Sequence, residues 1–144
     1  RQMCIRDRYC YEFRITVEPE AAAAAAIRRS DAALVEISDA LDLMRRATAA
    51  KAHREDADFA FHSAIARSSG NRYFATALEA LKDHIAVGMR FHGASIKAAQ
   101  DGLEEVLAEH RAIFEAIRDQ DEDAARRLMR LHLIGSRERV FEGI

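Results

Sequence analysis

The 144-residue sequence has few of the residues that interrupt helices, with one proline and six glycines, and it has no tryptophan. Its two cysteines, Cys4 and Cys10, both lie near the start, so they provide no disulfide framework of the kind found in small secreted domains. Alanine, leucine, arginine and glutamate are abundant instead. This composition favours helices along the whole chain.

The sequence also lacks a strong charge of either sign and any long apolar run. A formal net charge of −2 predicts no large basic surface, and therefore little direct affinity for nucleic acid. No segment approaches the roughly 18 apolar residues that a membrane-spanning helix needs. The basic residues at the start are not followed by the apolar core of a signal peptide. We therefore predict a cytoplasmic protein with no membrane partner.

Hydrophobic residues make up 49% of the chain and charged residues 32%, which is typical of one compact domain with a substantial core. Apolar residues recur at three- and four-residue spacing along most of the sequence, and this predicts five or six helices with no strand. Their connections are short, so neighbouring helices should be antiparallel. The expected helices cover residues 11–29, 32–50, 54–69, a fourth that carries Phe74 to Met89 on one face, 101–118 and 124–141.

Single residues mark several of the expected helix ends. Pro19 is compatible with a helix if it lies in the first turn. Gly70 is a natural C-terminal stop for the third helix, and Asn71 can cap the fourth. Gly88 and Gly93 make the end of the fourth helix uncertain. Asp121 or Asp123 can cap the last helix.

The first residues stand apart from this pattern. RQMCIRDR, residues 1–8, resembles the translation of a sequencing adapter, so we interpret residues 1–10 as a non-native or linker segment and leave them out of the fold prediction. The expected gene then extends further upstream. The alternative is a genuine short linker.

An acidic residue and a histidine share the apolar face of the third helix. Asp58 and His62 are four residues apart, so they lie side by side on the same face as Phe61 and Ile65. Burying a carboxylate and an imidazole is costly unless a partner compensates for the lost water. The two residues either form an ion pair within the helix or bind a common partner.

Two further histidines are expected to point inward from other helices. His110 lies on the apolar stripe of the fifth helix, between Leu107 and Ile113, and His132 lies on the inner face of the last helix. Three imidazoles and one carboxylate from three helices suit a divalent metal, namely zinc, nickel, cobalt, manganese or iron. Such a site carries a net charge of about +1 and would attract a small carboxylate. The alternative for each histidine is a hydrogen-bonded core residue.

The remaining histidines give weaker signals. His92 lies on the apolar stripe of the fourth helix if that helix is unbroken, where it either lines the pocket or packs in the core. His53 and His84 are expected at the rim or on the surface, without a role. We find no additional inward-facing glutamate or aspartate that could act as a general base, which disfavours a metal-dependent enzyme.

Three segments together resemble a known family. These segments are YEFRITVEPEAAAAAA (11–26), DADFAFHSAIARSSGN (56–71) and EHRAIFEAIRDQDEDAARRLMRLHL (109–133). In their order and spacing they are similar to the FCD domain, the C-terminal ligand-sensing domain of FadR-type GntR transcription regulators. The resemblance covers roughly residues 11–143.

The resemblance implies an antiparallel all-α bundle of six or seven helices around a central metal and ligand pocket. It implies Asp58, His62, His110 and His132 as metal ligands, with zinc the first choice of metal. It places Arg14 near the pocket, where a guanidinium can pair with an effector carboxylate. The alternative for Arg14 is an ion pair with Glu18 at the surface or at a helix end.

The implied function is effector binding and homodimerisation within a bacterial transcription regulator that senses a small organic acid or sugar acid. Family members begin with a winged helix-turn-helix domain that binds operator DNA, and nothing in this sequence resembles it. Residues 11–144 are thus expected to be the FCD domain alone. The alternatives are a metal-dependent enzyme and a purely structural helical dimerisation module.

Overall fold

The computed structural model describes residues 5–142, and it folds them into seven helices with no strand among them. Cys4 and the rest of residues 1–4 lie outside the described residues. The helices are α1 (Ile5–Arg28), α2 (Asp31–Ala49), α3 (Glu55–Ser68), α4 (Arg72–Ala80), α5 (Lys82–Ala98), α6 (Gly102–Arg118) and α7 (Glu122–Glu142).

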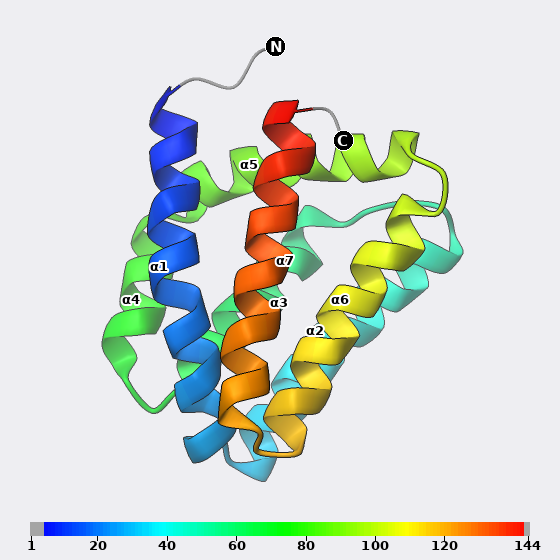
Figure 1. The fold of residues 1–144 in the computed structure, drawn as a ribbon. Helices are drawn as coiled ribbons and strands as arrows, with labels where there is room; N and C mark the ends of the chain where they lie inside the picture. The colour runs from blue at the N-terminus through cyan, green and yellow to red at the C-terminus, as the bar shows by residue number, and fades with distance from the viewer. Residues whose placement is uncertain (1–4, 143–144) are drawn as a thin grey trace.

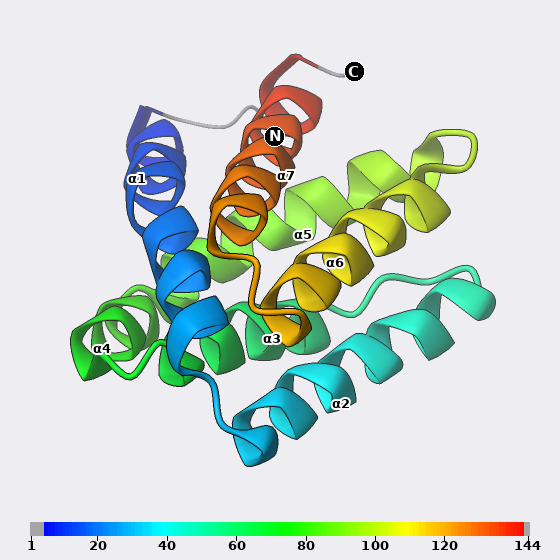
Figure 2. The same ribbon diagram turned by 60° about the horizontal axis from the view of Figure 1, so that its bottom comes forward.

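The helices form an antiparallel bundle, which confirms the predicted all-α fold (Figure 1). The first and last helices, α1 and α7, lie side by side in opposite directions, and α6 runs antiparallel to α7. The α2 and α3 pair packs below them (Figure 2). Helix α5 crosses one end of the bundle (Figure 1). Helix α3 contacts α1, α2, α4 and α5 and is therefore central.

Helix α1 differs from its prediction at both its start and its proline. It begins at Ile5, so residues 5–8 are helical rather than separate from the fold, and Pro19 lies well inside the helix and is buried. An interior proline removes one backbone hydrogen bond and costs about 3 kcal/mol. Burial of the alanines that follow, Ala21 to Ala23 and Ala25 to Ala26, against the bundle offsets this cost.

The predicted fourth helix is two helices. The chain leaves helical geometry at Leu81 (φ −101°, ψ 10°) and starts again at Lys82. The break allows Leu78 of α4 and Ile85 of α5 to pack in one apolar cluster with Phe59 of α3. Gly88 and Gly93, which made the end of the predicted fourth helix uncertain, lie inside α5 and are buried.

Other predicted helix ends are confirmed. Gly70 adopts a positive φ of 75° directly after α3. The Asn71 side chain accepts a hydrogen bond from the backbone N–H of Tyr73 at 3.1 Å and caps α4. The Asp121 side chain accepts one from Ala124 at 3.1 Å at the start of α7. Within residues 5–142, no helix combines the length and apolar character needed to cross a bilayer.

Candidate metal centre

The structure brings together the four residues that the sequence analysis assigned to a metal. Asp58 and His62 come from α3, His110 from α6 and His132 from α7, and all four side chains are buried. Ligand nitrogens of the three histidines lie within 4.8 Å of one another. The Oδ1 atom of Asp58 lies 3.2 Å from Nε2 of His62 and 3.2 Å from Nε2 of His110.

Each of the three histidines is oriented through its other ring nitrogen. Nδ1 of His62 lies 2.6 Å from Glu18 Oε1, Nδ1 of His110 lies 2.9 Å from the backbone oxygen of Val106, and Nδ1 of His132 lies 2.7 Å from Glu109 Oε1. These partners are acceptors only, so each Nδ1 carries a proton and donates it. The Nε2 atoms of the neutral rings are then lone-pair donors, as metal-bound histidines require.

The cluster therefore fits a divalent transition metal. Carboxylate Oδ1 of Asp58 faces two Nε2 atoms whose rings already hold their protons on Nδ1, and three lone-pair atoms repel one another unless a positive charge lies among them. A proton on Nε2 of His62 supplies that charge in the metal-free protein, and a metal ion supplies it when bound. Three imidazole nitrogens and a carboxylate oxygen match the ligands that zinc and its neighbours prefer.

The electrostatics of the cluster agree with this description. Burial disfavours the charged form of His62, but the carboxylates of Glu18 and Asp58 outweigh it and raise the pKa of His62 to about 9. Burial likewise opposes ionisation of Asp58, but its polar contacts with His110, His53 and His62 hold its pKa well below the usual range. The metal-free cluster thus contains an imidazolium between two carboxylates.

The histidine on α7 behaves differently from His62. Burial, together with the electrostatic influence of the neighbouring His110 and His62 rings, lowers the pKa of His132 well below its ordinary value. Its ring is stacked on His62, with the ring centroids 5.6 Å apart. His132 is therefore neutral at physiological pH and is ready to ligate without losing a proton.

Glu18 is a member of the site that the sequence analysis missed. Its Oε1 binds His62, and its Oε2 accepts a hydrogen bond from Arg14 Nε at 2.6 Å. Burial opposes its ionisation, but Arg14 and His62 lower the pKa of Glu18 to about 2. The expectation that no other carboxylate faces inward was thus wrong, although both oxygens of Glu18 are engaged in orienting neighbours. The sequence did carry a signal for Glu18. The spacing of three residues from Tyr11 to Arg14 and four from Arg14 to Glu18 places all three on one stripe of the helix.

Arg14 forms the ion pair that was its alternative assignment, but in a different place. The pair with Glu18 is buried in the middle of α1, not at the surface or at a helix end. Arg14 is 3% exposed and connects to the histidines through Glu18. It also borders a small cavity with Cys10 and Tyr11.

A second ion pair, between Glu109 and Arg139, lies beside His132. Arg139 of α7 donates to Glu109 Oε2 and to Nε2 of His92, the latter at 2.9 Å. Burial, together with the electrostatic influence of the His132 ring and the Arg139 guanidinium, lowers the pKa of His92 to about 3. The His92 ring centroid lies 6.3 Å from that of His132. His92 thus lies at the edge of the cluster. Neither Glu109 nor Arg139 had a sequence signal, because they contact His132 and His92 only through tertiary packing.

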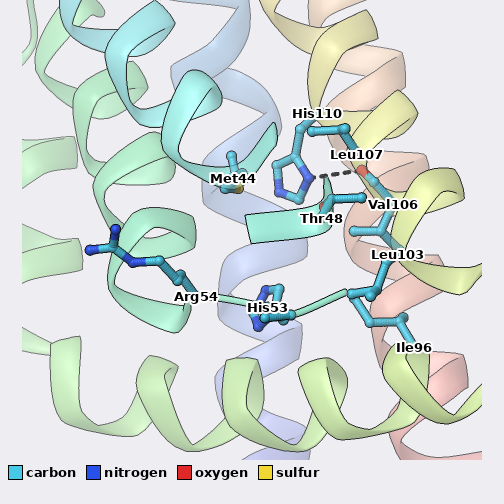
Figure 3. A pocket seen from close by; sticks show the side chains of 10 residues that line it. Met44, Thr48, His53, Arg54, Ile96, Leu103, Val106, Leu107 and His110 are labelled. Atoms are coloured by element: carbon cyan, nitrogen blue, oxygen red, sulfur yellow. Dashed lines mark hydrogen bonds between the residues drawn. The ribbon is translucent and has the colours of Figure 1, made fainter. Parts of the chain in front are cut away.

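The two histidines that were expected at the rim or surface differ from each other. His84 is exposed on α5, as expected. His53, in the segment between α2 and α3, is largely buried, and its Nε2 lies 3.1 Å from Asp58 Oδ2. A cavity of about 10 Å³, room for about one water, lies between His53 and His110 (Figure 3).

Known proteins resemble this chain in sequence and fold. The FCD domain family model matches residues 9–135. A GntR protein of Streptococcus agalactiae superposes with a TM-score of 0.72 at 26% identity, over 89% of this chain and 56% of that one. The McbR/YncC protein of Escherichia coli superposes with a TM-score of 0.72 at 16% identity, over 92% of this chain and 62% of that one, and shows the fold alone.

Among curated proteins, none matches the sequence significantly. The chain spans little more than half the length of the two solved structures that it resembles. The FCD match covers most of the chain and agrees with the motifs, the seven-helix bundle and the GntR likeness. It favours a regulatory domain over an enzyme. The chain therefore belongs to the FCD domain family, the family of ligand-sensing domains found in GntR-type regulators.

Proposed function

We propose that this domain senses a small organic acid or sugar acid at a divalent metal, as part of a GntR-type transcription regulator of the FadR subfamily. Asp58, His62, His110 and His132 would hold the metal, and zinc is the first choice. The observation that carries the proposal is the convergence of three buried imidazoles whose Nδ1 atoms are all held by acceptors.

The charge of the cluster supports an anionic effector. Two carboxylates, Asp58 and Glu18, and one guanidinium, Arg14, surround the proposed ion. Adding a divalent cation while His62 loses its proton leaves a net charge of about +1. A positive charge inside a low-dielectric bundle attracts one carboxylate strongly. When bound, the metal would supply an open coordination position for that carboxylate.

The side chains around the cluster suggest how an effector would be oriented. Arg14 can bind a second acidic or hydroxyl group if the effector displaces part of its contact with Glu18. His92 can donate from its Nδ1, because its Nε2 accepts from Arg139. The cavity beside His110 has room for about one water, so an effector that binds there would have to open the bundle. An effector that binds the opened bundle better than the closed one would have the differential affinity that a regulatory switch requires.

In the complete regulator, we propose, two such domains form a homodimer in the cytoplasm and operator DNA is bound only by a separate N-terminal winged helix-turn-helix domain. Residues 1–10 are proposed to be a non-native or linker segment ahead of the FCD domain at 11–144. Effector binding would change how the dimer holds its operator. A purely structural dimerisation module is the alternative, and it predicts no metal.

The first test is metal content, measured by elemental mass spectrometry on protein purified without a metal column. The wild-type protein should contain about one equivalent of a transition metal, and the variants Asp58→Ala/His62→Ala and His110→Ala/His132→Ala should contain none. His84→Ala, on an exposed histidine, is the matched control and should retain the metal. Stoichiometric metal in the double variants, or no metal uptake by the wild type, would refute the assignment.

The second test addresses the effector. Small carboxylates and sugar acids are screened for thermal stabilisation of the zinc-loaded protein, and each active compound is tested again on the chelated protein. Metal-dependent stabilisation supports the proposal. Stabilisation that is equal with and without zinc would argue for an effector that contacts the histidines directly. Turnover of any compound would support the enzyme alternative.

A further inference from the structure

The second oxygen of Asp58 has a partner outside the predicted ligand set. While Oδ1 faces His62 and His110, Oδ2 lies 3.1 Å from Nε2 of His53. A carboxylate cannot donate, so His53 donates through Nε2–H. In the metal-free protein His62 donates to Oδ1 and His53 donates to Oδ2, so the two bonds together restrict rotation of the carboxylate.

His53 is itself held in place by the backbone. The segment that follows α2 is closed by hydrogen bonds from Lys51 N to Thr48 O at 2.9 Å and from Ala52 N to Ala47 O at 2.8 Å. Lys51 has a φ of 58°, the left-handed conformation that ends many helices. His53 therefore directly follows a hydrogen-bonded helix end. Only 12% of its side chain is exposed.

The Nδ1 edge of the His53 ring lies against a glycine of α5. A Cβ atom added to Gly93 would lie 2.5 Å from Nδ1 of His53, far closer than atoms approach without a shift. Gly93 is buried in the middle of the helix, where glycine costs about 1 kcal/mol relative to alanine. The position of the ring accounts for a glycine at this point.

The ring also lies on the boundary between solvent and the cluster. His53 lines a surface groove of about 340 Å³ that includes Arg90 and Lys97. It also lines the small cavity beside His110 (Figure 3). Water reaching Asp58 from the groove would compete for its oxygens. His53 thus both holds Oδ2 and covers it.

We propose that His53 positions Asp58 for metal binding, and that Gly93 provides the space that the His53 ring occupies. This inference rests on the proposed metal site and adds a residue outside the four ligands. Residues that orient a ligand typically change metal affinity 10- to 100-fold when they are replaced. His53 acts through Asp58 and does not itself bind the ion.

The test compares zinc affinity among variants of the full chain, measured by competition with a chromophoric chelator. His53→Gln places an amide N–H near the position of Nε2, whereas His53→Asn is one methylene shorter and cannot reach Oδ2. We expect His53→Asn to weaken zinc binding about 10- to 100-fold and His53→Gln to retain most of the affinity. Gly93→Ala should weaken binding through displacement of the ring, and His84→Ala should have no effect.

Cobalt provides a readout that a merely structural role would not change. The visible absorption of bound Co²⁺ reports the geometry of its ligands, so it should change in His53→Asn and be restored in His53→Gln, while the melting temperatures of the metal-free variants stay similar. Equal zinc affinity in His53→Asn and wild type would overturn the inference. So would equal weakening in the asparagine and glutamine variants. Failure of the proposed metal site itself would show in the wild type, which would then bind neither metal.

Discussion

Glu18 illustrates at the scale of a residue how one buried side chain links two charges. Its two oxygens bind the Arg14 guanidinium and the His62 imidazole, both at 2.6 Å. Removing one partner of a buried ion pair costs about 3–5 kcal/mol, because the other charge stays buried without compensation. Glu18 therefore matters for stability as well as for the orientation of His62.

Glu18→Gln should destabilise the metal-free protein at pH 7 by about 3–5 kcal/mol. The pKa of Glu18 is lowered from its ordinary 4.5 to about 2 by Arg14 and His62, against burial. Its contribution is therefore fully present above pH 4.5 and is lost as the pH falls towards 2. The difference in unfolding free energy between variant and wild type should therefore decrease below about pH 4.5, by up to about 3 kcal/mol.

Urea denaturation of both proteins with a chelator, at several pH values between 7 and 3, measures this difference. Glu12→Gln, at an exposed position of the same helix, is the control and should change the unfolding free energy little at any pH. A difference for Glu18→Gln that stays constant as the pH falls would contradict the predicted linkage.

At the scale of the element, α1 combines a sequence that forms helices well with a role in packing. Its alanine run is buried because small side chains let α1 approach the neighbouring helices closely. The interior Pro19 is tolerated because these contacts persist on both sides of it. The same closeness leaves no room for larger side chains in this part of α1.

Ala25→Leu should destabilise the protein by about 1–3 kcal/mol, because Ala25 is fully buried in the main core cluster and three added carbon atoms must displace neighbours. Ala32→Leu, at an exposed position of α2, should change the unfolding free energy by less than about 0.5 kcal/mol. Thermal and urea unfolding measure both values. Equal stability of the two variants would show that the alanine run is not closely packed.

The cap of α4 is a second test at this scale. Asn71→Ala should cost about 1 kcal/mol, because the backbone N–H of Tyr73 loses its side-chain acceptor. Asn71→Asp keeps an acceptor and should retain most of the stability. Zinc affinity should not change in either variant, because Asn71 has no contact with the cluster among the described hydrogen bonds. A loss of zinc affinity would instead indicate a direct role for Asn71.

At the scale of the whole molecule, the candidate site joins parts of the chain that are far apart in sequence. Its four ligands come from α3, α6 and α7, and the side chains that orient them come from α1, α6 and the segment before α3. A metal bound there would connect three helices at once. Its binding free energy would then stabilise the bundle as a unit.

Zinc at a free concentration 100 times its Kd should raise the unfolding free energy by about 2.7 kcal/mol. Hydrogen exchange should slow in α3, α6 and α7 together, because the ion holds all three. The Asp58→Ala/His62→Ala variant should show neither effect. Protection confined to α3 would mean that zinc binds the Asp58–His62 pair without the other two histidines.

Much of this arrangement could be predicted from the sequence, because it depends on short-range spacing. The separation of Asp58 and His62 by four residues places them side by side on any α-helix, and the apolar stripes around His110 and His132 indicate inward faces. Gly70 and Asn71 mark a helix end through their own backbone preferences. These predictions required no knowledge of how the helices pack.

The parts that could not be predicted depend on contacts between distant elements. The break at Leu81 follows from the need of α4 and α5 to reach the same cluster beside Phe59, not from any breaker residue. Glu109 and Arg139 meet His132 and His92 only where α6, α7 and α5 converge. Sequence spacing indicates which face a side chain lies on, but not which neighbour it meets there.

The sequence by itself determined that this protein is an all-helical domain with a carboxylate and three imidazoles facing inward, because helical periodicity is a local property of the chain. Only the tertiary structure decided that Glu18 and His53 orient those groups. The orienting contacts join residues 44 and 5 positions apart through the packing of α1 and the end of α2 against α3. Such contacts follow from the geometry of packing, because burial leaves each charged group dependent on whichever partner the fold brings to it.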